Sequence, residues 1–64
     1  MNVAKIIKQL GGVAALRRKL EPKGISISYK GIEKWRERNK LPSAEVLITL
    51  QGIATEEGLT LDLT

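Results

Sequence analysis

Cationic and aromatic side chains are concentrated between residues 29 and 40, and together they have the chemistry needed to bind a nucleic acid. The segment contains Tyr29, Lys30, Lys34, Trp35, Arg36, Arg38 and Lys40. Lysine and arginine bind phosphates and donate hydrogen bonds to base edges. A turn joins this segment to an earlier amphipathic stretch, residues 13–20, and this layout is typical of a DNA-reading helix-turn-helix.

Positive charge is concentrated in the first two thirds of the chain, which includes this segment, and the remainder is acidic. All eleven Lys and Arg lie between Lys5 and Lys40, and residues 1–42 hold three glutamates, which gives 11 − 3 = +8. Residues 43–64 hold four acidic side chains and no basic ones, which gives 0 − 4 = −4. Because Lys and Arg release condensed counterions when they meet phosphates, the basic part favours a polyanionic partner. A solvated basic surface without a partner is the alternative interpretation.

Composition excludes several classes of function. The chain has 64 residues, enough for one small domain, and contains neither Cys nor His. Without a thiol or an imidazole, an enzyme, a bound metal or a cofactor is not expected. No apolar run approaches the roughly 18 residues that span a bilayer, and residues 1–10 lack a signal-peptide core. The sequence predicts a cytoplasmic protein with no membrane partner.

Apolar spacing predicts a mainly α-helical fold of four short helices within residues 1–58. Asn2 is expected to cap a first helix that ends at Gly11 and Gly12, and a second helix spans residues 13–20. The segment 21–24 is a helix breaker. Ser28, or alternatively Ser26, caps a third helix that ends near Arg38. Ser43 caps a fourth helix that ends by Gly58.

Residues 59–64 alternate apolar and polar side chains, which predicts a short C-terminal β-strand. Such a strand needs a partner. It could pair with its symmetry mate in an antiparallel ribbon and so act as a dimerisation element through Leu59, Leu61 and Leu63. The alternatives are that these leucines pack on the core of their own chain or that the segment is a loose tail.

The third predicted helix has an inward stripe made of Ile32 and Trp35, three residues apart. Trp35 is expected to belong to the core rather than to stack on bases. Gly31 is unusual within a helix. We expect it to allow a close approach to the surface formed by Ala14 and Ala15.

The pattern Ile27, Ser28, Gly31, Ile32 and Trp35, followed by a basic stretch that ends in Leu41-Pro42, resembles the Cro-like helix-turn-helix family of phage and prophage repressors. The segment from Gly11 to Leu16 is similar to the entry into the second helix of these proteins. The resemblance covers residues 1 to about 55. It departs from the family between Glu21 and Ile27, where this chain is longer. Either the third helix begins earlier than Ser28 predicts, or the turn is a true loop.

The resemblance and the helix geometry together assign roles to individual residues. The N-terminal turns of a recognition helix face base edges, which predicts base reading by Tyr29, Lys30, Glu33 and Lys34. Contacts to the DNA backbone are expected from Arg17, Arg18, Lys23, Ser28, Arg36, Arg38 and Lys40. A solvated helix face is the alternative for each of them, and for Ser28 the role of a helix cap is the stronger one.

These observations predict a sequence-specific, double-stranded DNA-binding transcriptional regulator that reads an operator through the major groove as a homodimer. The rival hypothesis is a small protein-binding helical module that docks on a host factor through its fourth helix and leucine-rich tail. Salt dependence separates the two, because phosphate contacts make affinity fall steeply with salt.

Overall fold

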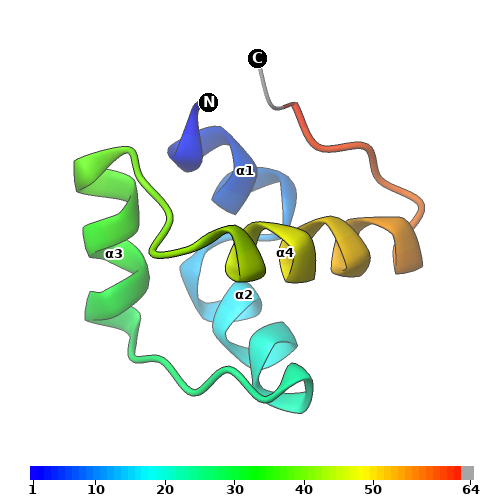
Figure 1. The fold of residues 1–64 in the computed structure, drawn as a ribbon, viewed down its shortest axis with the longest axis horizontal. Helices are drawn as coiled ribbons and strands as arrows, with labels where there is room; N and C mark the ends of the chain where they lie inside the picture. The colour runs from blue at the N-terminus through cyan, green and yellow to red at the C-terminus, as the bar shows by residue number, and fades with distance from the viewer. Residues whose placement is uncertain (63–64) are drawn as a thin grey trace.

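Side chains cap the helices that follow Asn2, Ser28 and Ser43. In this computed structural model, which describes residues 1–62, they are α1 (Val3–Gln9), α2 (Val13–Leu20), the short 3-10 helix η1 (Glu21–Lys23), α3 (Tyr29–Arg38) and α4 (Ala44–Glu56) (Figure 1). The side-chain oxygen of Asn2 accepts a hydrogen bond from the backbone N–H of Lys5 at 3.1 Å. Ser28 and Ser43 cap α3 and α4 in the same way, and the predicted caps are therefore confirmed.

All four helices contribute to one apolar core. The helix α2 packs against α3, and α1 packs against both, while α4 runs across the front of α1 and α2 in Figure 1. The buried side chains are Val3, Ile6, Ile7, Leu10, Leu16, Leu20, Ile32, Trp35, Val46, Leu50, Ile53 and Ala54. The prediction of a mainly α-helical fold with four helices is confirmed, as is the inward position of Ile32 and Trp35.

The connection between α2 and α3 is a true loop. The backbone continues from α2 into η1 and then reverses at Gly24, whose φ of 84° is left-handed. Ile25 and Ile27 are half-buried and pack against the core, so the loop is anchored by alternate side chains. Because α3 begins at Tyr29, directly after the Ser28 cap, the alternative of an earlier start for this helix is wrong.

The C-terminal segment lies against its own chain. Residues 59–62 form no strand, so the strand prediction is wrong for this part, and Leu63 lies outside the described residues. Leu61 is half-buried against the core, and the side-chain amide of Gln9 in α1 donates to the backbone carbonyl of Thr60 at 3.5 Å. The Lys5 ammonium also contacts the Asp62 carboxylate at 2.8 Å, which raises the pKa of Lys5 above its ordinary value. Side-chain contacts with α1 thus replace the ladder that the alternating pattern suggested.

Gly31 is close to a different neighbour from the one predicted. A Cβ at this position would lie 2.6 Å from Cγ1 of Ile27 and 2.9 Å from its Cδ1, and no atom of Ala14 or Ala15 is among its nearest contacts. The predicted approach to the Ala14 and Ala15 surface is therefore wrong. The missing side chain leaves room for Ile27, the last apolar residue of the loop, to fold over the first turn of α3.

Candidate nucleic-acid interface

The helix α3 has one buried side and one exposed side. Ile32 is fully buried and Trp35 is only 8% exposed, and both hold α3 against the core. Tyr29, Lys30 and Lys34 are exposed, whereas Glu33 is half-buried. Because residues three and four apart share a helix face, Lys30 and Lys34 lie one turn apart on the side away from the core. The four residues predicted to read bases therefore lie within the first two turns of α3.

The start of α3 is coupled to α2 through an aromatic contact. The guanidinium carbon of Arg17 lies 5.0 Å from the centre of the Tyr29 ring, which is the geometry of a cation–π pair. Tyr29 is 47% exposed, so the pair lies at the surface. A cation–π contact uses the positive charge of the guanidinium, and Arg17 makes no ion pair within residues 1–62. Arg17, predicted to contact the DNA backbone, thus lies beside the segment predicted to read bases.

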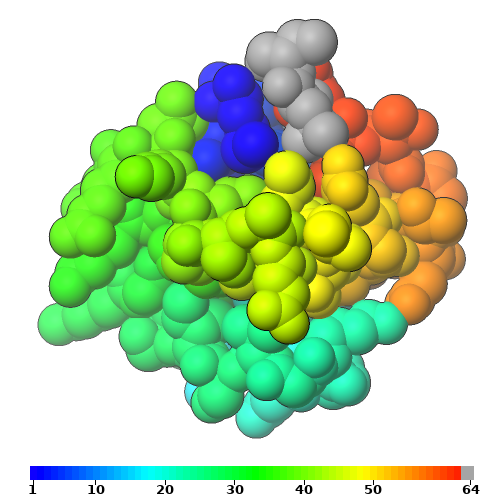
Figure 2. All heavy atoms as spheres, in the orientation of Figure 1, coloured from blue at the N-terminus to red at the C-terminus, as the bar shows by residue number. Residues whose placement is uncertain are grey.

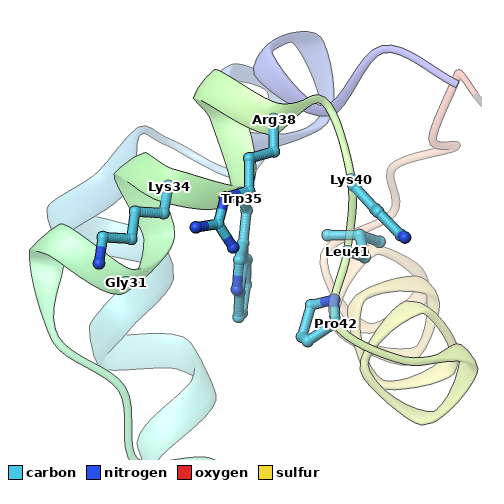
Figure 3. Close-up of a pocket in the computed structure, with 7 residues that line it drawn as sticks. All are labelled: Gly31, Lys34, Trp35, Arg38, Lys40, Leu41 and Pro42. Atoms are coloured by element: carbon cyan, nitrogen blue, oxygen red, sulfur yellow. The ribbon is translucent and has the colours of Figure 1, made fainter.

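A groove runs along the other flank of α3, between this helix and the loop that leads to α4. It has a volume of about 340 Å³ and is lined by Gly31, Lys34, Trp35, Arg38, Lys40, Leu41 and Pro42 (Figure 3). Lys34 and Arg38 are one turn apart on the helix side, and Leu41 and Pro42 form the opposite wall. The Lys40 side chain leaves the loop on the side away from Arg38 and Lys34. The groove therefore combines the apolar side chains of Trp35, Leu41 and Pro42 with two cations on its helix side.

Ion pairs divide the basic side chains of the chain into two groups. Lys19 contacts Glu57 at 2.9 Å, Lys23 contacts Glu56, and Lys5 contacts Asp62. In the part of the chain that the structure describes, the other candidate cations form no ion pair: Arg17, Arg18, Lys30, Lys34, Arg36, Arg38 and Lys40. Acids of residues 56–62 thus neutralise lysines of α1, α2 and η1. The cations of α3 remain available to an external anion.

Lys23 differs from the other predicted backbone contacts because its ammonium is already held by Glu56 at the end of α4. A phosphate would have to compete with this carboxylate. Ser28 is also engaged, since its hydroxyl oxygen accepts the backbone N–H of Gly31 at 3.1 Å. Its own O–H is still available as a donor.

A hydrogen bond links the end of α3 to the start of α1 through Asn39, a residue that the sequence did not single out for this role. Asn39 ends α3 with a left-handed backbone, at φ 52° and ψ 44°. Its side-chain Oδ1 accepts the backbone N–H of Val3 at 2.9 Å, a donor in the first turn of α1 that has no partner within the helix. Asparagine is well suited to both tasks, because it tolerates the left-handed region and carries a short acceptor. The residue joins the end of one helix to the start of another.

Comparison of this chain with family models, with curated proteins and with solved structures finds no match. Within residues 1–62 there is no helix long and apolar enough to cross a membrane. The same residues contain no cluster of three or more acidic side chains arranged to hold a metal ion. The interpretation of the site therefore depends on its own chemistry and geometry.

Proposed function

We propose that this chain is a sequence-specific, double-stranded DNA-binding transcriptional regulator of the Cro-like repressor type. In this proposal α3 enters the major groove of an operator, the protein acts as a homodimer, and no cofactor takes part. One observation carries the proposal. Within residues 1–62 every cation of α3 lacks an ion-pair partner, whereas Lys5 of α1, Lys19 of α2 and Lys23 of η1 are paired with acids of residues 56–62.

The exposed face of α3 has the donors and acceptors that base reading requires. Lys30 can donate to O6 or N7 of guanine, and Glu33 can accept from N4 of cytosine. Tyr29 presents an aromatic edge that suits a thymine methyl group or a phosphate. Because Lys30 and Glu33 are three residues apart, they share a face and can contact neighbouring base pairs.

The two flanks of α3 are suited to the phosphate backbones on either side of a groove. On one flank the stacked Arg17 presents a planar guanidinium, which can hold a phosphate through two parallel hydrogen bonds. On the other flank Lys34 and Arg38 line the groove beside Trp35. In this arrangement Arg17 and Arg38 contact the phosphate backbones of opposite DNA strands. Lys34 contacts a DNA phosphate as well as a base.

The salt dependence of binding to duplex DNA tests this proposal. Each phosphate contact contributes about 0.9 to the slope of log affinity against log salt. We expect Arg38→Gln to reduce that slope by about one. Lys8→Gln is the matched control, because Lys8 is an exposed cation of α1 that makes no ion pair within residues 1–62 and lies in neither flank. Equal losses in the two variants would indicate only a nonspecific effect of net charge.

One observation favours the rival hypothesis of a protein-docking module. Ile48 on α4 is 66% exposed and Leu59 is 39% exposed, so apolar side chains are accessible away from α3. A module that uses only these residues would bind duplex DNA weakly, without sequence preference. The salt titration therefore separates the two functions.

A further inference from the structure

The N-terminal half of α4 carries a protruding side chain next to a hollow. Ile48, at 66%, is the most exposed large hydrophobic side chain among the described residues. A hollow of about 280 Å³ lies nearby, lined by Met1, Asn39, Lys40, Leu41, Ser43, Ala44 and Leu47. Ala44 precedes Ile48 by four residues and so lies next to it on the helix surface. The protrusion and the hollow therefore adjoin each other along the N-terminal half of α4. This half of the helix lies at the front of the molecule in Figure 2.

The charges at this face are of opposite sign, and within residues 1–62 neither is held in an ion pair. Lys40 lies on the rim of the hollow, and Figure 3 shows its side chain turned away from Lys34 and Arg38. Glu45 is exposed and follows Ala44 directly. Neither Lys40 nor Glu45 forms an ion pair within residues 1–62. Because Glu45 precedes Ile48 by three residues, the face presents an unpaired cation at the hollow and an unpaired carboxylate beside the protruding side chain.

We infer that this face binds a second copy of the same chain about a twofold axis, with Ile48 of each protomer filling the hollow of its partner. A twofold contact uses the same patch on both subunits, so the patch must be complementary to itself. Here the protrusion matches the hollow, and the carboxylate of Glu45 matches the ammonium of Lys40. Another protein would need to supply both features, whereas a second copy already has them.

This inference rests on the proposed function in one respect, because both include a homodimer. It places the dimer contact on α4, whereas the sequence predicted that contact in the C-terminal tail. The described part of the tail is held by α1 of its own chain through Gln9 and Lys5. The inference also reassigns Lys40 from the DNA backbone to the partner subunit. Its test needs no DNA, so failure of the dimer contact is distinguishable from failure of DNA binding.

Sedimentation velocity over a concentration series measures the dimer directly. We expect the wild-type chain to dimerise and Ile48→Glu to raise the dissociation constant at least about 30-fold, as removal of a central apolar contact does in other interfaces. Leu59→Glu is the matched control, because it introduces the same charge at another exposed aliphatic side chain, one that lies outside the proposed contact. It should dimerise like the wild type.

A charge exchange provides a second test that does not depend on the apolar contact. Glu45→Lys should weaken the dimer by bringing like charges together, and adding Lys40→Glu should restore it. A wild-type chain that stays monomeric would overturn the inference. So would a dimer that Ile48→Glu leaves intact, a dimer that Leu59→Glu abolishes, or a double exchange that fails to restore association in a folded protein. Thermal unfolding of each variant establishes that it is folded.

Discussion

The contact between Gly31 and Ile27 predicts a mutational effect whose sign depends on the background. Replacing a glycine inside a helix by alanine ordinarily stabilises the protein by about 0.5–1 kcal/mol. At this position, however, the new Cβ would lie 2.6 Å from Cγ1 of Ile27, far closer than the ordinary separation of carbon atoms. Overfilling of this kind costs about 1–3 kcal/mol. We therefore expect Gly31→Ala to lower the free energy of unfolding by about 0.5–2 kcal/mol.

Removing the obstructing atoms should reverse the effect. Ile27→Ala deletes Cγ1 and Cδ1, and the closest remaining atom to the new Cβ is then the Ser28 hydroxyl oxygen at 3.5 Å, an ordinary contact. Ile27→Ala alone destabilises the protein because this side chain is half-buried against the core. In that background Gly31→Ala should stabilise by about 0.5–1 kcal/mol, since only the helix propensity remains.

Urea unfolding of the four proteins, the wild type, both single variants and the double variant, measures this coupling. The expected interaction energy is about 1–3 kcal/mol in favour of the double variant. If Gly31→Ala raises stability in both backgrounds by the same amount, Ile27 does not occupy the space above Gly31 and the packing described for the loop is refuted.

Three further changes test other parts of the structure. Gly52→Ala should stabilise by about 0.5–1 kcal/mol in urea unfolding, because a Cβ there meets no atom within 4 Å, and an unchanged midpoint would contradict this. Asn39→Ala should lower the free energy of unfolding by about 2 kcal/mol, because alanine loses the acceptor for the Val3 N–H and is strained in the left-handed region. Asn39→Gly should lower it by only about 1 kcal/mol, because glycine loses the same acceptor but adopts the left-handed backbone without strain. Equal losses in the two variants would show that the left-handed backbone carries no strain. Lys30→Gln should weaken operator binding with little effect on stability, and an unchanged affinity would exclude Lys30 from base reading.

Local signals in the sequence determine much of this fold. Serine and asparagine caps, paired glycines and apolar spacing act over a few residues, which is why the start and end of α2 and the caps of α1, α3 and α4 agree with the prediction. The stripe of Ile32 and Trp35 follows from helical periodicity in the same way. These features need no knowledge of where one helix lies relative to another.

The features that the sequence did not reveal are contacts between residues distant in the chain. The alternating pattern of the tail is compatible with a strand, but Gln9 and Lys5 of α1 supply hydrogen-bond and charge partners that hold it in another conformation. The link between Asn39 and Val3 and the stacking of Arg17 on Tyr29 likewise depend on helix packing. A left-handed asparagine after a helix is a signal that could have directed attention to the first of these.

For the candidate interface, the Ser28 cap and helix geometry, together with the family resemblance, were enough to predict Tyr29, Lys30, Glu33 and Lys34 within two turns of one helix. The pairing of Lys23 with Glu56 was not accessible in this way, because η1 and the end of α4 are distant in the sequence. Net charge identified a basic segment, but only the ion pairs distinguish cations that are neutralised from cations that are available.

Selection from randomised duplex DNA at near-physiological salt, with sequencing of the bound fraction, tests the central claim most directly. A dimer that places α3 in successive major grooves should enrich a palindromic motif whose half-sites lie about one helical turn apart, and Lys30→Gln should change the preferred base within each half-site. A folded protein that enriches no sequence under these conditions would contradict the proposal that α3 is a DNA-reading helix.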